Sequence, residues 1–269
     1  MEARAMTTPR LAADGARLSY GGKVVSEHLT VAIPDGSFTV IVGANACGKS
    51  TLLRALARLL PTTEGAVVLD GRNILSLPTR EVAKTIGLLP QTSVAPDGIT
   101  VADLVAHGRY PHQRMLKQWS AADAAAVDEA LELTETAALA DRFVDELSGG
   151  QRQRAWIAMA LAQETPYLLL DEPTTYLDIA HQIDVLELCA ALNRRGRTLV
   201  AVLHDLNHAA RYATHLIALK DGSLVAEGNP REVVSAEFVQ EVFGVESTIL
   251  SDPYSGSPLV VPAGRSAKA

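Results

Sequence analysis

The sequence has few of the features that mark secreted or nucleic-acid-binding proteins. Its 269 residues include only two cysteines, Cys47 and Cys189. Two cysteines give no disulfide framework, so we expect the reducing cytosol as the compartment. Acidic residues outnumber basic ones by 31 to 24, and the formal net charge is -7. This balance argues against nucleic-acid binding through bulk positive charge.

Long apolar runs are also missing. The first stretch, "MEARAMTTPRLAADG", lacks the apolar core of a secretory signal peptide. No segment approaches the ~18–20 uninterrupted apolar residues that a membrane-spanning helix needs. If the protein works at a membrane, we therefore expect it to do so through a partner.

Three short apolar runs organise the chain: "FTVIVG" (38–43), "YLLLD" (167–171) and "TLVAVLH" (198–204). Runs of this length without polar alternation are typical of strands that are buried on both faces of a parallel sheet. Because a helical pattern follows each run, the sequence predicts an α/β fold with a mostly parallel sheet. Gly turns and a Pro-Asp-Gly turn in 17–42 predict an additional antiparallel β subdomain.

The middle of the chain reads differently. Residues from about 95 to 162 are rich in alanine with helical spacing and contain no strand candidate, which predicts an inserted all-helical subdomain. We expect one nucleotide-binding domain over 10–250. The ends, 1–9 and 251–269, are rich in Gly, Pro, Ser and Ala, so we expect them to be flexible or loosely attached.

The stretch "GANACGKST" (43–51) fits the phosphate-loop pattern G-x-x-x-x-G-K-[ST] between an apolar strand and an amphipathic helix. Gly43 and Gly48 let consecutive N–H groups converge on phosphate oxygens at the positive end of a helix. Lys49 is expected to reach the terminal phosphates and Ser50 to bind Mg²⁺. We expect nucleotide contacts from the whole loop: Gly43, Ala44, Asn45, Ala46, Cys47, Gly48, Lys49, Ser50 and Thr51.

Cys47 has two interpretations. It is either a small filler at a variable position of the loop or a thiol that the helix start and Lys49 activate.

Acidic residues end one of the apolar runs. Asp171 and Glu172 in "LLLDEP" should project into the crevice at the carboxyl edge of the sheet. We assign Asp171 to Mg²⁺ and Glu172 to the role of general base for an attacking water. His204 ends another run and is suited to hydrogen-bond a γ-phosphate or that water. Zinc is not expected at His204 and His208, because no third ligand is evident.

A second helix start with bare backbone occurs in "LSGGQ" (147–151). Ser148 is a fitting N-cap, and a side chain at Gly149 or Gly150 would obstruct the close approach of a ligand. One nucleotide has no obvious use for two phosphate-facing helix starts in the same chain. Two copies of the chain, arranged head to tail, would use both.

Taken in order, "GANACGKST", "LSGGQ", "LLLDEP", "TTYLD" and "VLHD" resemble the ATP-binding subunit of an ABC transporter over roughly residues 10–245. The resemblance implies a P-loop NTPase (RecA-like) core that binds ATP and Mg²⁺. It also implies a sandwich homodimer in which each phosphate loop faces the partner's "LSGGQ". Its nucleotide-facing residues are then Ser148, Gly149, Gly150 and Gln151.

The same resemblance assigns further roles. Tyr20 matches the aromatic residue that stacks on adenine, and Gln91 the glutamine that touches Mg²⁺ and the attacking water. Asp178 matches the loop that bridges the two subunits, and His204 the switch histidine. The chain departs from the commonest phosphate loop at Ala44 and Ala46, which replace a frequent Pro and Gly. If that Gly takes a positive φ, Ala46 is strained.

Longer stretches, among them "LVAHGRYPH" and "VLHDLNHAARYATHLIALKDGSLVAEGNP", are similar to ATPases of bacterial importers for ferric siderophores, haem and vitamin B12, and lean to siderophores. This implies an ATP hydrolase on the cytoplasmic face of the inner or plasma membrane, bound to two integral-membrane permease subunits. An extracytoplasmic substrate-binding protein would act through the permease, and nucleic acid would play no part. The permease contact is expected near Gln91 and 92–115.

Two other classes of ABC ATPase remain as alternatives. Many exporters fuse the ATPase to membrane helices, which this sequence lacks. ABC ATPases that act on DNA or ribosomes usually carry long coiled coils or a charged linker between two domains, and this sequence has neither. A simple P-loop kinase would lack "LSGGQ".

Overall fold

A six-stranded sheet forms the centre of the protein. The computed structural model describes residues 9–91, 95–113 and 119–263, and the sheet has the strand order β10-β9-β3-β8-β7-β6. The three runs predicted as strands are β3 (Phe38–Gly43), β7 (Tyr167–Asp171) and β8 (Thr198–Val202), and every residue in them is buried. Their pairings are parallel, which confirms the predicted fold class. The other strands are β6 (Ile86–Leu89), β9 (His215–Lys220) and the antiparallel edge strand β10 (Ser223–Gly228).

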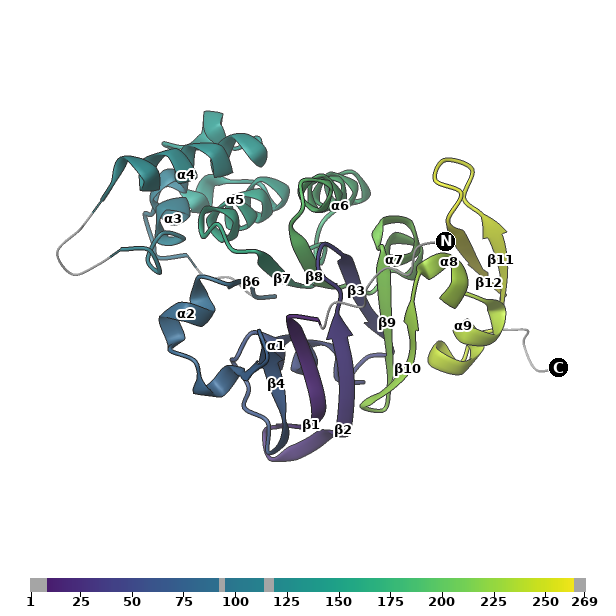
Figure 1. Ribbon diagram of the computed structural model, residues 1–269. Coiled ribbons are helices and arrows are strands. Elements are labelled where there is room, and N and C mark those ends of the chain that lie inside the picture. The colour runs from purple at the N-terminus through teal and green to yellow at the C-terminus, as the bar shows by residue number, and fades with distance from the viewer. Residues whose placement is uncertain (1–8, 92–94, 114–118, 264–269) are drawn as a thin grey trace, which may run out of the picture.

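A second, antiparallel sheet packs against the first through a helix. Its order is β2-β1-β4-β5. Helix α1 (Lys49–Leu56) lies between the two sheets, and its leucines share an apolar cluster with both. The strands of this sheet are β1 (Leu11–Tyr20), β2 (Lys23–Ile33), β4 (Glu64–Leu69) and β5 (Arg72–Asn73). Figure 1 shows this sheet below the central one.

A group of helices stands beside the central sheet at the upper left of Figure 1. It consists of α3 (Val101–His107), α4 (Ala121–Leu133) and α5 (Gly149–Ala162), which pack on one another through buried aliphatic residues. We call these three helices the helical lobe. Short 3-10 turns, η2 (Ala137–Leu139) and η3 (Val144–Glu146), link α4 to α5. The lobe follows β6 and precedes β7, so it interrupts the central sheet in sequence.

The remaining helices surround the two sheets. They are η1 (Ile74–Ser76), α2 (Thr79–Ala83), α6 (Ile179–Arg194), α7 (Leu206–Tyr212), α8 (Pro230–Val233) and α9 (Ala236–Phe243). None of the helices in the described part of the chain is long and apolar enough to cross a membrane.

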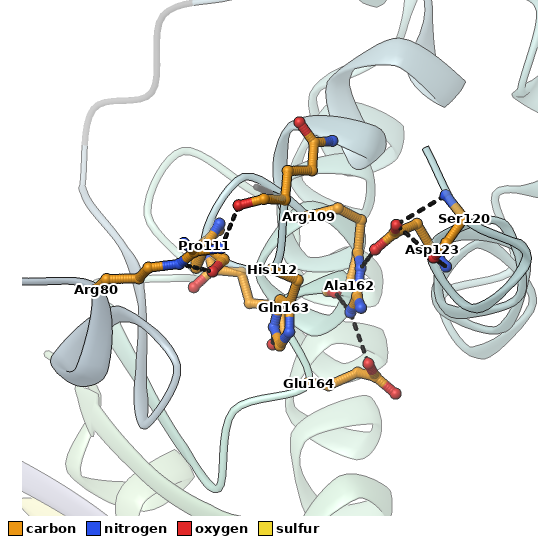
Figure 2. Close-up of polar contacts among 10 residues, drawn as sticks. Arg80, Arg109, Pro111, His112, Ser120, Asp123, Ala162, Gln163 and Glu164 are labelled. Carbon is orange, nitrogen blue, oxygen red and sulfur yellow. Dashed lines mark hydrogen bonds and ion pairs between the residues drawn. The ribbon is translucent and has the colours of Figure 1, made fainter. Parts of the chain in front are cut away.

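A buried arginine joins the helices of the lobe, as Figure 2 shows. Arg109 donates to Asp123 at 2.9 Å, and to Ala162 O and Glu164 at 2.6 Å each. Hydrogen bonds from Ser120, and then the Arg109 guanidinium, hold the pKa of Asp123 below its usual range. Because Asp123 is buried and Arg109 is its cationic partner, the charge of Asp123 depends on this arginine, whereas Arg109 also pairs with Glu164.

Arg80 connects the lobe to the rest of the domain. From α2 it donates to Pro111 O at 2.8 Å and to Gln113 O, and Figure 2 shows it reaching across to this segment. The permease contact expected at 92–115 lies partly outside the described residues, because 92–94 and 114–115 are not described.

The expectation of a loosely attached C-terminal tail is wrong for residues 251–263. Strand β12 (Pro258–Pro262) pairs antiparallel with β11 (Ser247–Ser251). The hairpin is bound to α7, because the Asn207 side chain accepts from Val260 N at 2.7 Å and donates to Val260 O at 3.2 Å. Val260 is also buried in the main core. Residues 1–8 and 264–269 lie outside the described residues.

Candidate active site

A cavity of about 660 Å³ opens at the carboxyl ends of β3, β7 and β8. Open α/β sheets bind ligands at this edge. The cavity brings together residues from distant parts of the sequence: Tyr20, Lys23, Val24, Val25, Asn45, Ala46, Gly48, Lys49, Ser50, Thr51, Glu172, His204, Asp221 and Gly222. Most of the residues predicted from the phosphate loop, together with Tyr20, Glu172 and His204, therefore share one site.

The phosphate loop is fixed by its contact with strand β9. Gly43 has φ of 146°, and an ideal Cβ there would overlap the Leu219 carbonyl oxygen and lie 2.7 Å from Cys47 Sγ. A residue with a side chain therefore cannot replace Gly43 without moving the loop. Ala46 has φ of 63°, so it is in the left-handed conformation that strains an alanine.

Helix α1 begins at the cavity, which its first residues Lys49, Ser50 and Thr51 line. Its N-cap, Gly48, has φ of 106° and, as a glycine, offers no side chain to accept hydrogen bonds from the first N–H groups of the helix. The buried Lys49 Nζ donates to the carbonyl oxygens of Gly43 and Ala44 at 2.9 Å each. A positive ammonium group and a helix N-terminus in one concavity favour a polyanionic ligand.

Cys47 packs under this loop and has 4% of its surface exposed. Burial raises the pKa of its thiol, although Lys49 acts in the opposite direction. A raised pKa leaves little of the reactive thiolate. These observations favour the interpretation of Cys47 as a filler.

Asp171 ends β7 and reaches the first turn of α1. It accepts a hydrogen bond from Ser50 Oγ at 2.8 Å, and Arg54 Nε lies 3.8 Å from its other oxygen. Burial raises the pKa of Asp171, and Ser50 and Arg54 partly offset this effect. Burial therefore opposes the charged form of this carboxylate more strongly than Ser50 and Arg54 favour it.

Arg54 is a site residue that sequence reasoning missed. Its guanidinium lies 5.6 Å from the centre of the Tyr20 ring and donates to the Tyr20 hydroxyl at 3.4 Å. Tyr20 is 56% exposed at the mouth of the cavity. The available signal was spacing, because Arg54 follows Ser50 by four residues and so lies on the same face of α1.

Glu172 is held by two residues from distant segments and by one from its own turn. Its Oε2 accepts from Gln91 Nε2 at 2.6 Å and from Thr175 Oγ1 at 3.1 Å, and its Oε1 lies 2.7 Å from His204 Nε2. The backbone of Glu172 has φ of 54°, a conformation that is concentrated at functional sites in non-glycine residues. Thr175 was not predicted. The structure thus joins the predicted Gln91, Glu172 and His204 in one hydrogen-bonded group.

The predicted "LSGGQ" residues do not line this cavity. Ser148 is the N-cap of α5, and the two residues cap each other: Ser148 Oγ accepts from Gln151 N at 3.3 Å, and Gln151 Oε1 accepts from Ser148 N at 3.1 Å. Asp178 caps α6 and is also absent from the cavity lining. The predicted site residues therefore form two groups within one chain.

The two glycines of "LSGGQ" differ from each other. An ideal Cβ at Gly149 would meet only Leu177 Cδ2 at 3.9 Å, whereas one at Gly150 would overlap the His181 imidazole. Gly150 therefore has a reason for being glycine within its own chain, because the His181 side chain takes the space beside it. His181 was missed by sequence reasoning.

A phosphate loop, a buried aspartate and a fixed glutamate at the edge of a parallel sheet define a P-loop nucleoside triphosphatase. The chain belongs to the ABC transporter family, whose sequence model matches residues 26–175. This confirms the family that the motifs predicted. As a member, the chain binds and hydrolyses ATP.

Individual relatives match over nearly their whole length. The ferric enterobactin transport ATP-binding protein FepC of Escherichia coli strain K12 is 57% identical over 96% of each chain. The petrobactin import ATP-binding protein FpuD of Bacillus anthracis is 50% identical over 97% of this chain and 94% of its own. The dimeric structure of a bacterial ABC transporter cassette, 29% identical, superposes with a TM-score of 0.71 over 81% of this chain and 98% of that one.

Proposed function

We propose that this chain is the ATP-hydrolysing subunit of a bacterial importer for a ferric siderophore or a related iron, haem or cobalamin complex. Two proteins named for ferric enterobactin transport and petrobactin import match the chain over nearly their full length, at 57% and 50% identity, and these matches support this cargo class. The cargo would cross the membrane through two permease subunits that receive it from an extracytoplasmic binding protein. The chain itself would lie peripherally on the cytoplasmic face of the membrane.

The separation of the predicted residues into two groups carries the proposal. The cavity holds the phosphate loop and Glu172, while Ser148 to Gln151 and Asp178 lie outside its lining. A head-to-tail homodimer brings the "LSGGQ" helix start of each chain onto the cavity of the other. The dimeric cassette to which the chain is similar supports this arrangement. Each active site would then be split between two copies of the chain.

Within one chain, the cavity would position ATP by several groups at once. Tyr20 offers an exposed ring for adenine to stack on, and Arg54 fixes that ring from one side. Backbone N–H groups between Gly43 and Thr51 would donate hydrogen bonds to the phosphate oxygens. Lys49 would give up its bonds to the loop carbonyls and donate to the phosphate oxygens instead. Most of the binding energy would therefore come from backbone and charge.

The residues at the edge of β7 fit a magnesium ion. Ser50, Asp171 and Gln91 offer the hydroxyl, carboxylate and amide oxygens that Mg²⁺ prefers, and Mg²⁺ in phosphate sites is usually held by few protein oxygens. Burial raises the pKa of Asp171, and a cation bound beside the carboxylate would offset this effect by favouring the charged form. Bound there, Mg²⁺ would neutralise charge on the terminal phosphates.

Glu172 is suited to act as general base. Its carboxylate would accept the proton of a water that attacks the γ-phosphorus, while Gln91 and His204 hold the carboxylate in place. His204 would also donate to the γ-phosphate. In the dimer, the α5 helix start of the partner would stabilise the charge on the same phosphate.

Mixing two inactive chains tests the split site. Lys49→Ala removes one half of a site, and Ser148→Arg blocks the other half. A mixed pair of these two variants retains one site with both halves intact, so it should hydrolyse ATP well above either parent. If mixtures stay as inert as the parents while crosslinking shows that they pair, the sandwich arrangement is wrong.

The cargo is tested in cells. A deletion strain grown under iron limitation, on one defined ferric siderophore at a time, should fail on at least one of them. Restoring the wild-type chain should rescue that growth, and the Glu172→Gln chain should not. Normal growth of the deletion strain on every siderophore, haem and cobalamin source would contradict the cargo class.

A further inference from the structure

His181 lies between the α5 helix start and Asp178, the two elements that each chain would present to its partner in the sandwich dimer. It is in the first turn of α6, whose N-cap is Asp178. Asp178 Oδ1 accepts from His181 N at 2.9 Å and from His181 Nδ1 at 2.7 Å. Two bonds to one carboxylate oxygen fix the imidazole ring against the Asp178 side chain.

The other edge of the same ring lies on the start of α5. An ideal Cβ at Gly150 would overlap the ring and lie 2.7 Å from its Nε2 atom, closer than the 3.0 Å that real Cβ atoms respect. Gly150 is therefore glycine because His181 occupies the space beside its Cα. Any side chain at this position would push the ring away and strain its bond to Asp178.

A second contact joins α5 and α6 further along the two helices. Arg154 of α5 donates to Asp184 of α6 at 2.8 Å. Because Asp184 is partly exposed, this ion pair adds little stability. It is a second contact between the two helices whose starts meet at Gly150 and His181.

From these contacts we infer that His181 is a positioning residue that holds the α5 helix start and the Asp178 carboxylate at a fixed separation. The inference rests on the proposed sandwich dimer, in which the α5 helix start acts on the nucleotide of the partner and Asp178 belongs to the loop that bridges the two subunits. His181 itself does not line the cavity of its own chain. Its loss should therefore impair hydrolysis by the dimer and leave nucleotide binding by the single chain intact.

The first test separates turnover from binding. His181→Ala should lower kcat by about 10²-fold, because misplacing a reacting group by ~1 Å costs about that much. The Kd of a fluorescent ATP analogue for the isolated chain should change less than about twofold, since its binding groups stay in place. His181→Asn, which retains a side-chain N–H donor, should recover part of kcat. His28→Ala, on the exposed surface of β2, is the matched control and should leave both values unchanged.

A steric suppressor test addresses the contact with Gly150 directly. Gly150→Ala should lower kcat because the new methyl group displaces the ring. In the double variant Gly150→Ala/His181→Ala the methyl group has room, so the two losses should not add. If the fold-loss of kcat in the double variant equals the product of the two single fold-losses, the two positions act independently. Gly150 would then be glycine for another reason, and the inference would be overturned.

Mixed pairs distinguish a failure of this inference from a failure of the proposed function. A Lys49→Ala chain paired with a His181→Ala chain retains one site with an intact Lys49 and an intact partner-donated half, so hydrolysis should return. If this pair is inert while Lys49→Ala with Ser148→Arg is active, His181 acts within its own chain and the inference fails alone. If both mixtures are inert although they pair, the sandwich itself is wrong.

Discussion

Two helices of this protein begin in ways that suit different partners. Helix α1 begins at Gly48, which has no side chain to cap the first turn, and this helix start lines the cavity of the same chain. Helix α5 begins at Ser148, where Ser148 and Gln151 satisfy each other. The first helix start is open to phosphate before anything else assembles. The second is capped within its own chain and, in the proposed sandwich dimer, would meet a phosphate only when another chain approaches.

This difference places two kinds of function in two parts of the molecule. The core around α1 should bind ATP by itself, since the phosphate loop and Lys49 belong to one chain. The helical lobe, which carries α5, should contribute only to hydrolysis in the dimer. Variants that damage one part should therefore leave a recognisable property of the other unchanged.

Replacing the general base should have the largest effect. Glu172→Gln should lower turnover by about 10²–10⁴-fold, the usual contribution of a positioned acid or base. ATP binding should persist, and a stable dimer should form in MgATP on size-exclusion chromatography. Normal turnover by this variant would show that another group takes the proton.

Removing the buried guanidinium of the lobe should have the next largest effect, and this effect is on stability. Arg109→Met leaves the Asp123 carboxylate buried without its charge partner, which should cost about 3–5 kcal/mol of unfolding free energy. Urea denaturation measures this change. The matched control is Arg72→Met, whose partner Glu81 is exposed, and it should cost less than about 1 kcal/mol. Equal losses would show that Arg109 contributes no more than a surface residue.

A pair of variants contrasts the two helix starts directly. Lys49→Ala should weaken ATP binding by about 30-fold, the worth of roughly 2 kcal/mol for hydrogen bonds to a charged group. Ser148→Arg should abolish hydrolysis and change the Kd for ATP less than about twofold, because it acts on the other chain's nucleotide. Fluorescence titration and a phosphate-release assay separate these outcomes. A parallel loss of binding in both variants would place the two helix starts at one site in a single chain.

Acid should loosen the lobe through Asp123. The pKa of this carboxyl is lowered in the folded protein, so its contribution to stability is present above the unfolded pKa of about 3.9. That contribution is lost as the pH falls through the lower folded value. Asp123→Asn should therefore flatten the dependence of Tm on pH below about pH 4. An unchanged dependence would assign the acid sensitivity to other carboxyl groups.

The smallest effect is expected at the phosphate loop itself. Ala46→Gly removes the strain of a left-handed alanine but makes the unfolded chain more flexible. The net effect should raise the free energy of unfolding by about 0.5–1 kcal/mol. Thermal denaturation measures the gain, and the Kd for ATP should not change, because the loop donates backbone groups. A lower Tm would mean that Ala46 packs better than its φ suggests.

The sequence by itself determined the class of the protein and most of the cavity. The phosphate loop is nine consecutive residues, 43–51, so its chemistry is local and can be recognised without a fold. The apolar runs determined the parallel strands for the same reason, because a strand buried on both faces must be apolar throughout. The ends of those strands then indicated that Glu172 and His204 lie near the loop.

Only the tertiary structure decided which side chains support these residues. Arg54 reaches Tyr20 and Asp171, His181 fills the space beside Gly150, and the tail strand β12 binds Asn207. Each of these contacts joins residues that are far apart in the sequence or on different elements. Their partners depend on how helices and sheets pack, and packing leaves no periodic pattern in a single sequence.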